Sequence, residues 1–295
     1  MNFAILSSPN SWYLRDLERA ADMRHRLQAI PFTQLNSSLT NGDCRVASCS
    51  APLTEFDGVL VRTMPPGSLE QVVFRMDLLA QLESRGTTVV NSARAIETAV
   101  DKYLALAKLE AAGLPIPPTF ICQTADDAMV GFEGLGGDVV VKPLFGGEGR
   151  GMVRVSDRAI GWRTFQTLSQ MNCVLYLQQF IEHCGFDIRL LVLGDEVLAM
   201  RRSNASDWRT NVSLGATASA YEPQAAEIEL AVIAARTIGA TIAGVDVLPG
   251  KDGRRHVLEV NAVPGWKALA RTLKIDIAAR VLDHLVMQVR GAKER

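Results

Sequence analysis

The sequence has few cysteines and no long apolar run, and both absences exclude classes of protein. Its five cysteines are an odd number without a Cys-x-x-Cys pair, so no complete disulfide framework is expected. We interpret them as small buried side chains in a reducing cytosol: Cys44, Cys49, Cys122, Cys173 and Cys184. No apolar run approaches the roughly 18–20 residues of a bilayer span, and the N-terminus lacks the basic stretch of a signal peptide. We therefore expect a cytoplasmic protein without a membrane partner.

An excess of charge of either sign is also missing. Lys and Arg total 31, Asp and Glu total 32, and the net charge is −1. This balance excludes a globally basic nucleic-acid-binding surface and leaves only a local basic patch open, so we expect no nucleic-acid partner. With 48% hydrophobic and 21% charged residues, the chain is neither disordered nor collagen-like. At roughly 150 residues per domain, its length predicts about two domains.

The hydrophobic patterning predicts a small parallel α/β unit over residues 1–98. Strands are expected at 3–6, 56–61 and 87–90, with helices at 12–29 and 69–84, the second capped by Ser68. A second unit should cover residues 99–295, beginning with a helix at 101–112. Its further expected elements are helices at 160–170, 227–239 and from 275, and strands at 119–122, 138–142, 174–178, 187–200 (with a turn), 244–248 and 256–261.

A glycine-rich loop follows the strand that ends at Lys142. Glycines allow backbone N–H groups to approach phosphate oxygens closely, and the lysine ammonium at the strand end can reach a phosphate. The spacing is neither that of a Walker A motif nor that of a dinucleotide-binding fingerprint, and the alternative is a flexible hairpin turn. Lys102, at the start of a predicted helix, would by itself be a surface lysine. The loop glycines are Gly146, Gly147, Gly149 and Gly151.

The hairpin near the C-terminus brings acidic residues together. Glu259 and Asn261 are two apart and so share one face of their strand. If Leu248 pairs with Val257, Asp246 lies opposite Glu259 on that face, where two carboxylates repel unless a cation is bound. Oxygen ligands without Cys or His favour Mg²⁺ or Mn²⁺. The alternative is an exposed polar face, against which the apolar flanking residues argue.

Arginines lie between the loop and this hairpin. Asp187 and Arg189 share a strand face, Arg202 ends the next strand, and Arg209 and Asn211 belong to a polar loop. The planar guanidinium suits the negative charge that develops in phosphoryl transfer. Taken singly, each arginine would be a surface ion pair.

The order of these motifs resembles the ATP-grasp superfamily, specifically its RimK-like glutamate ligases. The resemblance covers about residues 99–290 and rests on VDKYLALAKLEAAGLPIPPT, VVVKPLFGGEGRGM, LQQFIEHCGFDIRLLVLGDEVLAMRR, DWRTN and AGVDVLPGKDGRRHVLEVNAVPGW. It implies an α/β protein, α+β in the catalytic part, with an ATP-grasp fold behind a Rossmann-like pre-ATP-grasp domain. The implied domains are 1–98 and 99–295, the latter divided into a lid subdomain (99–175) and an ATP- and metal-binding subdomain (176–295).

The resemblance also implies roles for individual residues. Lys102 and Lys142 would contact ATP, as would Arg189, and Asp187 would bind its ribose. The mobile loop over the phosphates would contain Gly146, Gly147, Gly149 and Gly151. The hinge that binds adenine would consist of Gln178, Gln179, Phe180 and Ile181. Facing the acyl phosphate are the catalytic Arg202, Arg209 and Asn211. Two divalent ions, Mg²⁺ or Mn²⁺, would be bound by Asp246, Glu259 and Asn261. The family usually has Glu at the position of Gln179, which puts a side-chain contact of that residue with the nucleotide in doubt.

The implied activity is amide-bond formation through an acyl phosphate, with ATP, a small-molecule carboxylate acceptor and L-glutamate as substrates. The stretch over residues 61–91 and the segment EVNAVPGW resemble ligases that act on pterin cofactors such as tetrahydromethanopterin. The alternatives are a ribosomal-protein glutamate ligase of the RimK type, a ligase for another metabolite, a kinase-like phosphotransferase and a non-catalytic nucleotide-binding regulator. On the pterin hypothesis Arg62, Met64, Arg75 and Trp266 line the acceptor pocket, although Arg75 fits a helix surface and Trp266 a core anchor. The family often forms dimers or tetramers, so a homo-oligomer is expected.

Overall fold

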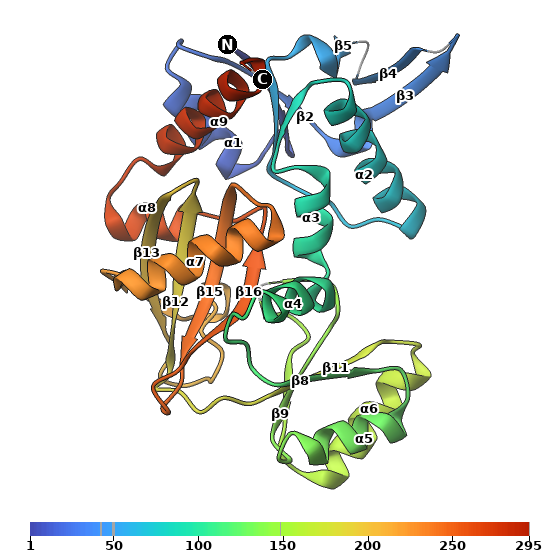
Figure 1. Ribbon diagram of the computed structural model, residues 1–295, viewed down its shortest axis with the longest axis vertical. Helices are drawn as coiled ribbons and strands as arrows, with labels where there is room; N and C mark the ends of the chain where they lie inside the picture. Colours follow the sequence, from blue (N-terminus) through green and yellow to red (C-terminus); the bar gives the residue numbers. More distant parts are fainter. Residues whose placement is uncertain (42, 49–50, 148, 295) are drawn as a thin grey trace.

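The computed structural model describes residues 1–41, 43–48, 51–147 and 149–294 (Figure 1). Its N-terminal part is a parallel sheet, as the apolar strands predicted. The strand order is β2 (Arg26–Ile30), β1 (Asn2–Leu6), β6 (Gly58–Val61), β7 (Thr88–Val90). The helices of this part are α1 (Trp12–Ala21), α2 (Leu69–Ser84) and the C-terminal α9 (Ile277–Lys293), which returns to pack against α1, β6 and β7. The predicted helix at 69–84 is confirmed, and Ser68 caps it by accepting a hydrogen bond from the Gln71 N–H.

The predicted helix at 12–29 is wrong in its second half. Helix α1 ends at Ala21, because Asp22 and Met23 have left-handed backbone angles (φ 38° and 56°). Residues Arg26–Ile30 then run as a strand beside β1. The spacing of apolar residues in RLQAI fits a half-buried edge strand as well as a helix, so pattern alone could not separate them. The sequence also gave no signal for the antiparallel strands β3 (Leu35–Thr40), β4 (Asp43–Ser48) and β5 (Ala51–Pro52).

A small antiparallel sheet forms the second part of the molecule, at the bottom of Figure 1. Its order is β10 (Val153–Val155), β9 (Val139–Lys142), β11 (Leu175–Gln179), β8 (Thr119–Cys122). Helices α5 (Ala125–Gly134) and α6 (Arg158–Gln170) pack together over it, with the rings of Phe132 and Phe165 6.2 Å apart. The lid subdomain was expected to end at residue 175. Strand β11, however, belongs wholly to this sheet and continues to Gln179, past that expected boundary.

The third part is a five-stranded antiparallel sheet. Its order is β14 (Thr217–Ala220), β13 (Glu196–Ser203), β12 (Phe186–Leu193), β15 (Ile242–Pro249), β16 (Arg255–Asn261). Helix α7 (Ala225–Ile238) crosses the sheet, and α8 (Lys267–Leu273) packs beside β13 and β14. Helices α3 (Ala93–Val100) and α4 (Lys102–Ala111) connect the three parts (Figure 1). Short 3₁₀ turns occur at η1 (Phe32–Gln34), η2 (Leu53–Glu55) and η3 (Val212–Leu214).

The hairpin register differs slightly from the one expected. Asp246 does pair with Glu259, but Leu248 pairs with His256 rather than Val257. A β-bulge at Leu258 absorbs the one-residue shift, since Asp246 faces Glu259 while Val247 already faces Val257.

The cysteines are less buried than expected. Cys44 is buried, but Cys122 and Cys173 are half-buried and Cys184 is exposed. Of these four described cysteines, only Cys44 is the small buried side chain that the sequence predicts. Cys49 lies outside the described residues. In the part of the chain that the structure describes, no helix is long and apolar enough to cross a membrane.

Candidate active site

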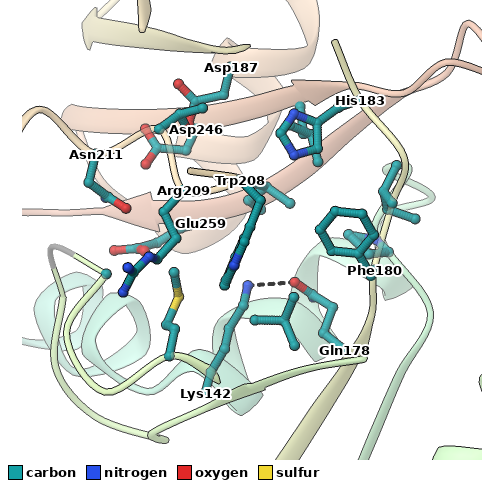
Figure 2. Close-up of a pocket in the computed structure, with 18 of the residues that line it drawn as sticks. Lys142, Gln178, Phe180, His183, Asp187, Trp208, Arg209, Asn211, Asp246 and Glu259 are labelled. Carbon is teal, nitrogen blue, oxygen red and sulfur yellow. Dashed lines mark hydrogen bonds between the residues drawn. The ribbon is translucent and has the colours of Figure 1, made fainter. Parts of the chain in front are cut away.

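A cleft of about 700 Å³ lies between the small sheet and the five-stranded sheet (Figure 2). Most of the predicted site residues line it: Lys142, Gly149, Gln178, Gln179, Phe180, Ile181, Asp187, Arg202, Arg209, Asn211, Asp246 and Glu259. The others lie outside its lining: Lys102, Gly146, Gly147, Gly151, Arg189 and Asn261. Motifs more than 100 residues apart thus meet in one cleft.

Lys142 ends strand β9 and points into the cleft. Its ammonium donates a hydrogen bond to Gln178 Oε1 at 2.5 Å, and Gln178 Nε2 donates to Thr119 Oγ1 at 3.0 Å. Burial lowers the pKa of Lys142 to about 8, although the nearby charge of Glu259 opposes this shift. A buried ammonium bonded to a neutral amide keeps most of its charge available to an anionic ligand.

Lys102 connects helix α4 to the glycine loop. Its ammonium donates to the carbonyl oxygens of Leu144, at 3.3 Å, and Gly146, at 2.5 Å, and burial lowers its pKa. Further along the loop, Gly149 has φ +73°, and a Cβ there would lie 2.5 Å from Asn211 Oδ1. The loop therefore approaches the polar segment after β13 so closely that only glycine fits. Glu148, within the predicted loop, lies outside the described residues.

A buried network of ion pairs forms the floor of the cleft. The guanidinium of Arg202 bonds both oxygens of Asp187, at 2.7 and 2.5 Å, and lies 2.9 Å from Asp246 Oδ2. Arg189 bonds Asp246 Oδ1 at 2.7 Å. Burial by itself would raise the pKa of Asp246, but the charges of Arg189 and Arg202 outweigh it and lower that pKa. The same carboxylates outweigh the effect of burial on Arg202 and raise its pKa. Asp246 is thus an ionised carboxylate neutralised by two arginines.

Glu259 has no such partners. Within the described ranges, no hydrogen bond or ion pair holds its carboxylate, which points into the cleft. Burial raises its pKa, and the charge of Asp246 raises it further. Asn261 is turned away, because its Oδ1 accepts a hydrogen bond from the Val263 N–H at 2.8 Å. No group of three or more His, Cys, Asp or Glu side chains suited to a metal is found among the residues described.

Aromatic side chains form one end of the cleft, and sequence reasoning recognised only part of them. Trp208 meets the Phe180 ring edge-to-face at 6.1 Å, and His183 lies 5.8 Å from Phe180. Figure 2 shows Trp208 on the side of this group that faces Arg209. Trp208 belongs to the DWRTN segment, whose polar residues indicate a site. An aromatic residue within that segment is the feature of the sequence that could have predicted this aromatic end. Gln179 turns its amide toward the Leu135 carbonyl at 3.2 Å, away from an adenine-binding role for its side chain.

Arg209 is fixed from behind by Asp207. Its Nη2 lies 2.6 Å from Asp207 Oδ2, and its Nε donates to the same carboxylate at 3.1 Å. With 30% of its side chain exposed, Arg209 stands beside Glu259 and Asn211 at the open side of the cleft (Figure 2). The pair restrains the guanidinium without burying it.

The residues expected in an acceptor pocket lie elsewhere. Trp266 is fully buried, stacks on Arg62 at 4.2 Å and donates its indole N–H to Asp16, which is the geometry of a core anchor. Arg75 is also buried, and it donates to the Pro65 carbonyl at 2.7 Å, so the helix-surface alternative is wrong. Neither lines the cleft.

The comparisons with known proteins agree with this geometry. Residues 99–285 match the RimK-like ATP-grasp domain, and residues 1–96 match the RimK PreATP-grasp domain. The chain belongs to the RimK-like ATP-grasp family. It is therefore an ATP-grasp ligase with a pre-ATP-grasp domain at its N-terminus, which confirms the fold and the enzyme class predicted from the motifs.

Curated relatives in this family carry two different substrate names. The chain is 34% identical over 262 residues to a tetrahydromethanopterin:alpha-L-glutamate ligase of Methanosarcina acetivorans, covering 79% of this chain and 81% of the relative. It is 31% identical to a ribosomal protein bS6–L-glutamate ligase of Escherichia coli, covering 96% and 94%. Among solved structures, the ATP-grasp ligase PsnB bound to a minimal precursor superposes with a TM-score of 0.79 at 22% identity, covering 97% and 98%.

Proposed function

We propose that this RimK-like ligase uses ATP to join L-glutamate to the carboxylate of a pterin-type cofactor, such as a tetrahydromethanopterin. One observation carries the proposal: a single cleft holds both the half-buried ammonium of Lys142 and the unpaired carboxylate of Glu259. A nucleoside triphosphate with bound divalent cations satisfies both groups, since its phosphate oxygens meet the lysine and its cations meet the carboxylate. The relative from Methanosarcina acetivorans supports the pterin acceptor.

The two ends of the cleft suit the two ends of a nucleotide. Phe180 and Trp208 give an aromatic surface on which a purine base would pack. Lys142 and the glycine loop lie at the end where the phosphates would bind. Both carboxylate oxygens of Asp187 accept hydrogen bonds from Arg202. A ribose hydroxyl that contacts Asp187 would therefore bind a carboxylate that Arg202 also binds. ATP therefore fits the cleft well, because its base suits the aromatic end and its phosphates suit the end that carries Lys142.

The acidic residues fit divalent ions to different degrees. Glu259 fits well, because a half-buried carboxylate that has lost part of its hydration and has no partner is costly, and a cation removes that cost. Asp246 fits as a ligand if it exchanges one of its arginine contacts, and Asn261 if its amide turns from Val263. Bound Mg²⁺ would neutralise phosphate charge; Mn²⁺ prefers the same oxygen donors, and a PsnB structure contains Mg with ADP.

The reaction proceeds in two steps. An oxygen of the acceptor carboxylate attacks the γ-phosphorus of ATP, forming an acyl phosphate and releasing ADP. The amine of glutamate then attacks the acyl carbon, loses a proton and expels inorganic phosphate as the amide forms. Arg209, held by Asp207, would stabilise the oxyanion of this second step, and the glycine loop would exclude water from the acyl phosphate.

ADP release, measured over a matrix of carboxylates and amines, tests the proposal. We expect ADP to form only when a pterin acceptor and L-glutamate are both present, with a product heavier by one glutamyl unit. ADP formation without any amine would indicate a phosphotransferase. Nucleotide binding without turnover across the whole matrix would indicate a regulator.

A second function is favoured by one comparison. The Escherichia coli ligase named for ribosomal protein bS6 matches this chain over 96% of its length. The same matrix should therefore include a peptide that ends in glutamates. Faster turnover with that peptide than with any pterin would assign the chain to protein modification, and turnover with neither would point to another metabolite.

A further inference from the structure

A second hollow of about 1420 Å³ lies between helix α8 and strand β14, and we name it the α8–β14 groove. Among the residues that line it are Tyr13, Val212, Ala220, Lys267 and Arg271. Val212 follows directly on the segment 209–211, whose three residues line the cleft. The chain between β13 and β14 therefore contributes residues to both hollows.

The groove carries positive charge without an internal counter-charge. Lys267 and Arg271 are both exposed, and neither forms an ion pair with any residue that the structure describes. Lys267 only approaches the Trp12 ring, at 5.3 Å. Both cations also line a neighbouring hollow together with Asp16 and Asp276, but these two acids bond Arg19 at 2.9 and 2.8 Å. The lining of the groove itself contains no carboxylate.

The spacing of the two cations makes their isolation unfavourable. Lys267 and Arg271 are four apart in α8, so they lie on one face of the helix, where like charges destabilise each other. An anion bound between them would remove this repulsion. Opposite them, β14 is an edge strand that, among the strands described, pairs with β13 alone and leaves backbone donors and acceptors along its other side. The groove thus combines cations with a row of hydrogen-bonding groups.

We infer that this groove binds the carboxylate-bearing tail of a small-molecule acceptor, which must then carry a second carboxylate besides the one that is activated. This inference rests on the proposed function. Two cations match a short acidic tail of which one or two carboxylates lie between them. With its tail between α8 and β14, the acceptor would pass Val212 and present its reactive carboxylate beside Arg209 and Asn211. Lys267 and Arg271 are then specificity residues.

The inference has a consequence for the number of additions. Joining glutamate consumes one carboxylate of the acceptor and brings two, so the product has one more negative charge than the acceptor. The product would therefore occupy the same groove at least as well as the acceptor. A single enzyme could then add glutamates in succession, each new terminus being the next carboxylate to react.

Equilibrium binding to the full-length protein tests the groove independently of turnover. The probes are pteroate, with one carboxylate, and pteroyl-triglutamate, with several; the variants are the double change K267Q/R271Q and the charge-retaining K267R/R271K. We expect wild-type protein to bind pteroyl-triglutamate about tenfold more tightly than pteroate. The double Gln variant should lose this preference and K267R/R271K should keep it. R163Q, an exposed arginine of α6 far from the groove, is the control and should keep it too.

The outcomes separate this inference from the proposed function. Equal affinity of wild-type and K267Q/R271Q protein for pteroyl-triglutamate overturns the groove, whatever the enzyme's activity. Tetra-L-glutamate binding as tightly as pteroyl-triglutamate would assign the groove to a peptide tail and overturn the small-molecule occupant. If turnover fails with every acid and amine while the binding preference holds, the proposed ligase reaction is wrong and the groove remains. Thermal unfolding of the variants shows whether each is folded.

Discussion

Asp246 and Glu259 are paired residues of the neighbouring strands β15 and β16, yet only Asp246 is neutralised by the protein. Arg189 and Arg202 lie 2.7 and 2.9 Å from its carboxylate oxygens. The Glu259 carboxylate faces the same cleft with no bonded partner among the residues described. A pair of carboxylates that looks symmetrical in the strand register is therefore electrostatically unequal. The two residues should respond differently to substitution.

Replacing Glu259 by Gln should abolish turnover and leave the fold intact. The change keeps the side-chain volume but removes the charge that a divalent cation needs, so we expect ADP release to fall by roughly a hundredfold or more. Because the buried carboxylate has no partner, the unliganded protein should be as stable as the wild type or more so. Glu229→Gln, at an exposed position of α7, is the control. Near-normal turnover of the Glu259 variant with Mg²⁺ would exclude Glu259 as a ligand.

Replacing Arg202 by Met should instead destabilise the fold. The loss leaves Asp187 without its guanidinium and Asp246 with only one, and breaking a buried ion pair from one side costs about 3–5 kcal/mol. Denaturant unfolding of the two proteins measures the difference. Arg201→Met is the matched control, because Arg201 is exposed on the same strand, where it stacks on Phe186 and donates a hydrogen bond to Ser203 Oγ, so its loss should cost about 1 kcal/mol or less. Similar losses for both variants would mean that the buried network contributes nothing special.

The affinity for nucleotide should fall above about pH 8. Burial lowers the pKa of Lys142 to about 8, and only the ammonium form attracts phosphate. The charged fraction of a group with this pKa drops about tenfold between pH 7 and pH 9, and ADP affinity, measured by calorimetry across that range, should follow it. Lys142→Met should bind ADP weakly and without this pH dependence. An unchanged wild-type affinity at pH 9 would place Lys142 away from the phosphates.

The same shift in pKa acts on stability in the opposite direction. Because the pKa of Lys142 is lower in the folded state, the unfolded chain binds more protons between about pH 8 and the ordinary value of 10.5. The contribution of this lysine to the free energy of unfolding should therefore rise as the pH increases through that window. Comparing wild type with Lys142→Met isolates this contribution from other titrating groups.

Substituting Gly149 by Ala should slow the enzyme more than the same change at Gly147. At Gly149 the backbone angle (φ +73°) is unfavourable for alanine, and the new Cβ would lie 2.5 Å from Asn211 Oδ1. The loop would have to move away from Asn211, and we expect kcat to fall about tenfold or more. A Cβ at Gly147 meets no described atom within 4 Å, so Gly147→Ala is the control. Equal kcat values for the two variants would show that the approach of Gly149 to Asn211 has no part in turnover.

The sequence by itself determined the family and most of the local structure. The glycine loop after VVVK, the carboxylates of the last hairpin and the order of five motifs are local patterns, and local chemistry fixes what they form. Helix α2 and its Ser68 cap were predicted to the residue for the same reason, since capping depends on neighbours three residues away. Where local preferences were balanced, as in the RLQAI segment, the pairing partner β1 decided between helix and strand.

Only the tertiary structure decided which charges are neutralised. The sequence pattern predicts that Asp187, Arg202 and Asp246 lie near one another. It does not predict that Arg202 bonds both aspartates while Glu259 has no partner among the residues described. Such pairing depends on the register of four strands, β12, β13, β15 and β16, and on a bulge at Leu258, which spacing could not show. The α8–β14 groove could not be predicted either, because three segments far apart along the chain form it, at Tyr13, at 212–220 and at 267–272. Ion pairs are decided at distances of about 3 Å, and only packing sets positions to that precision.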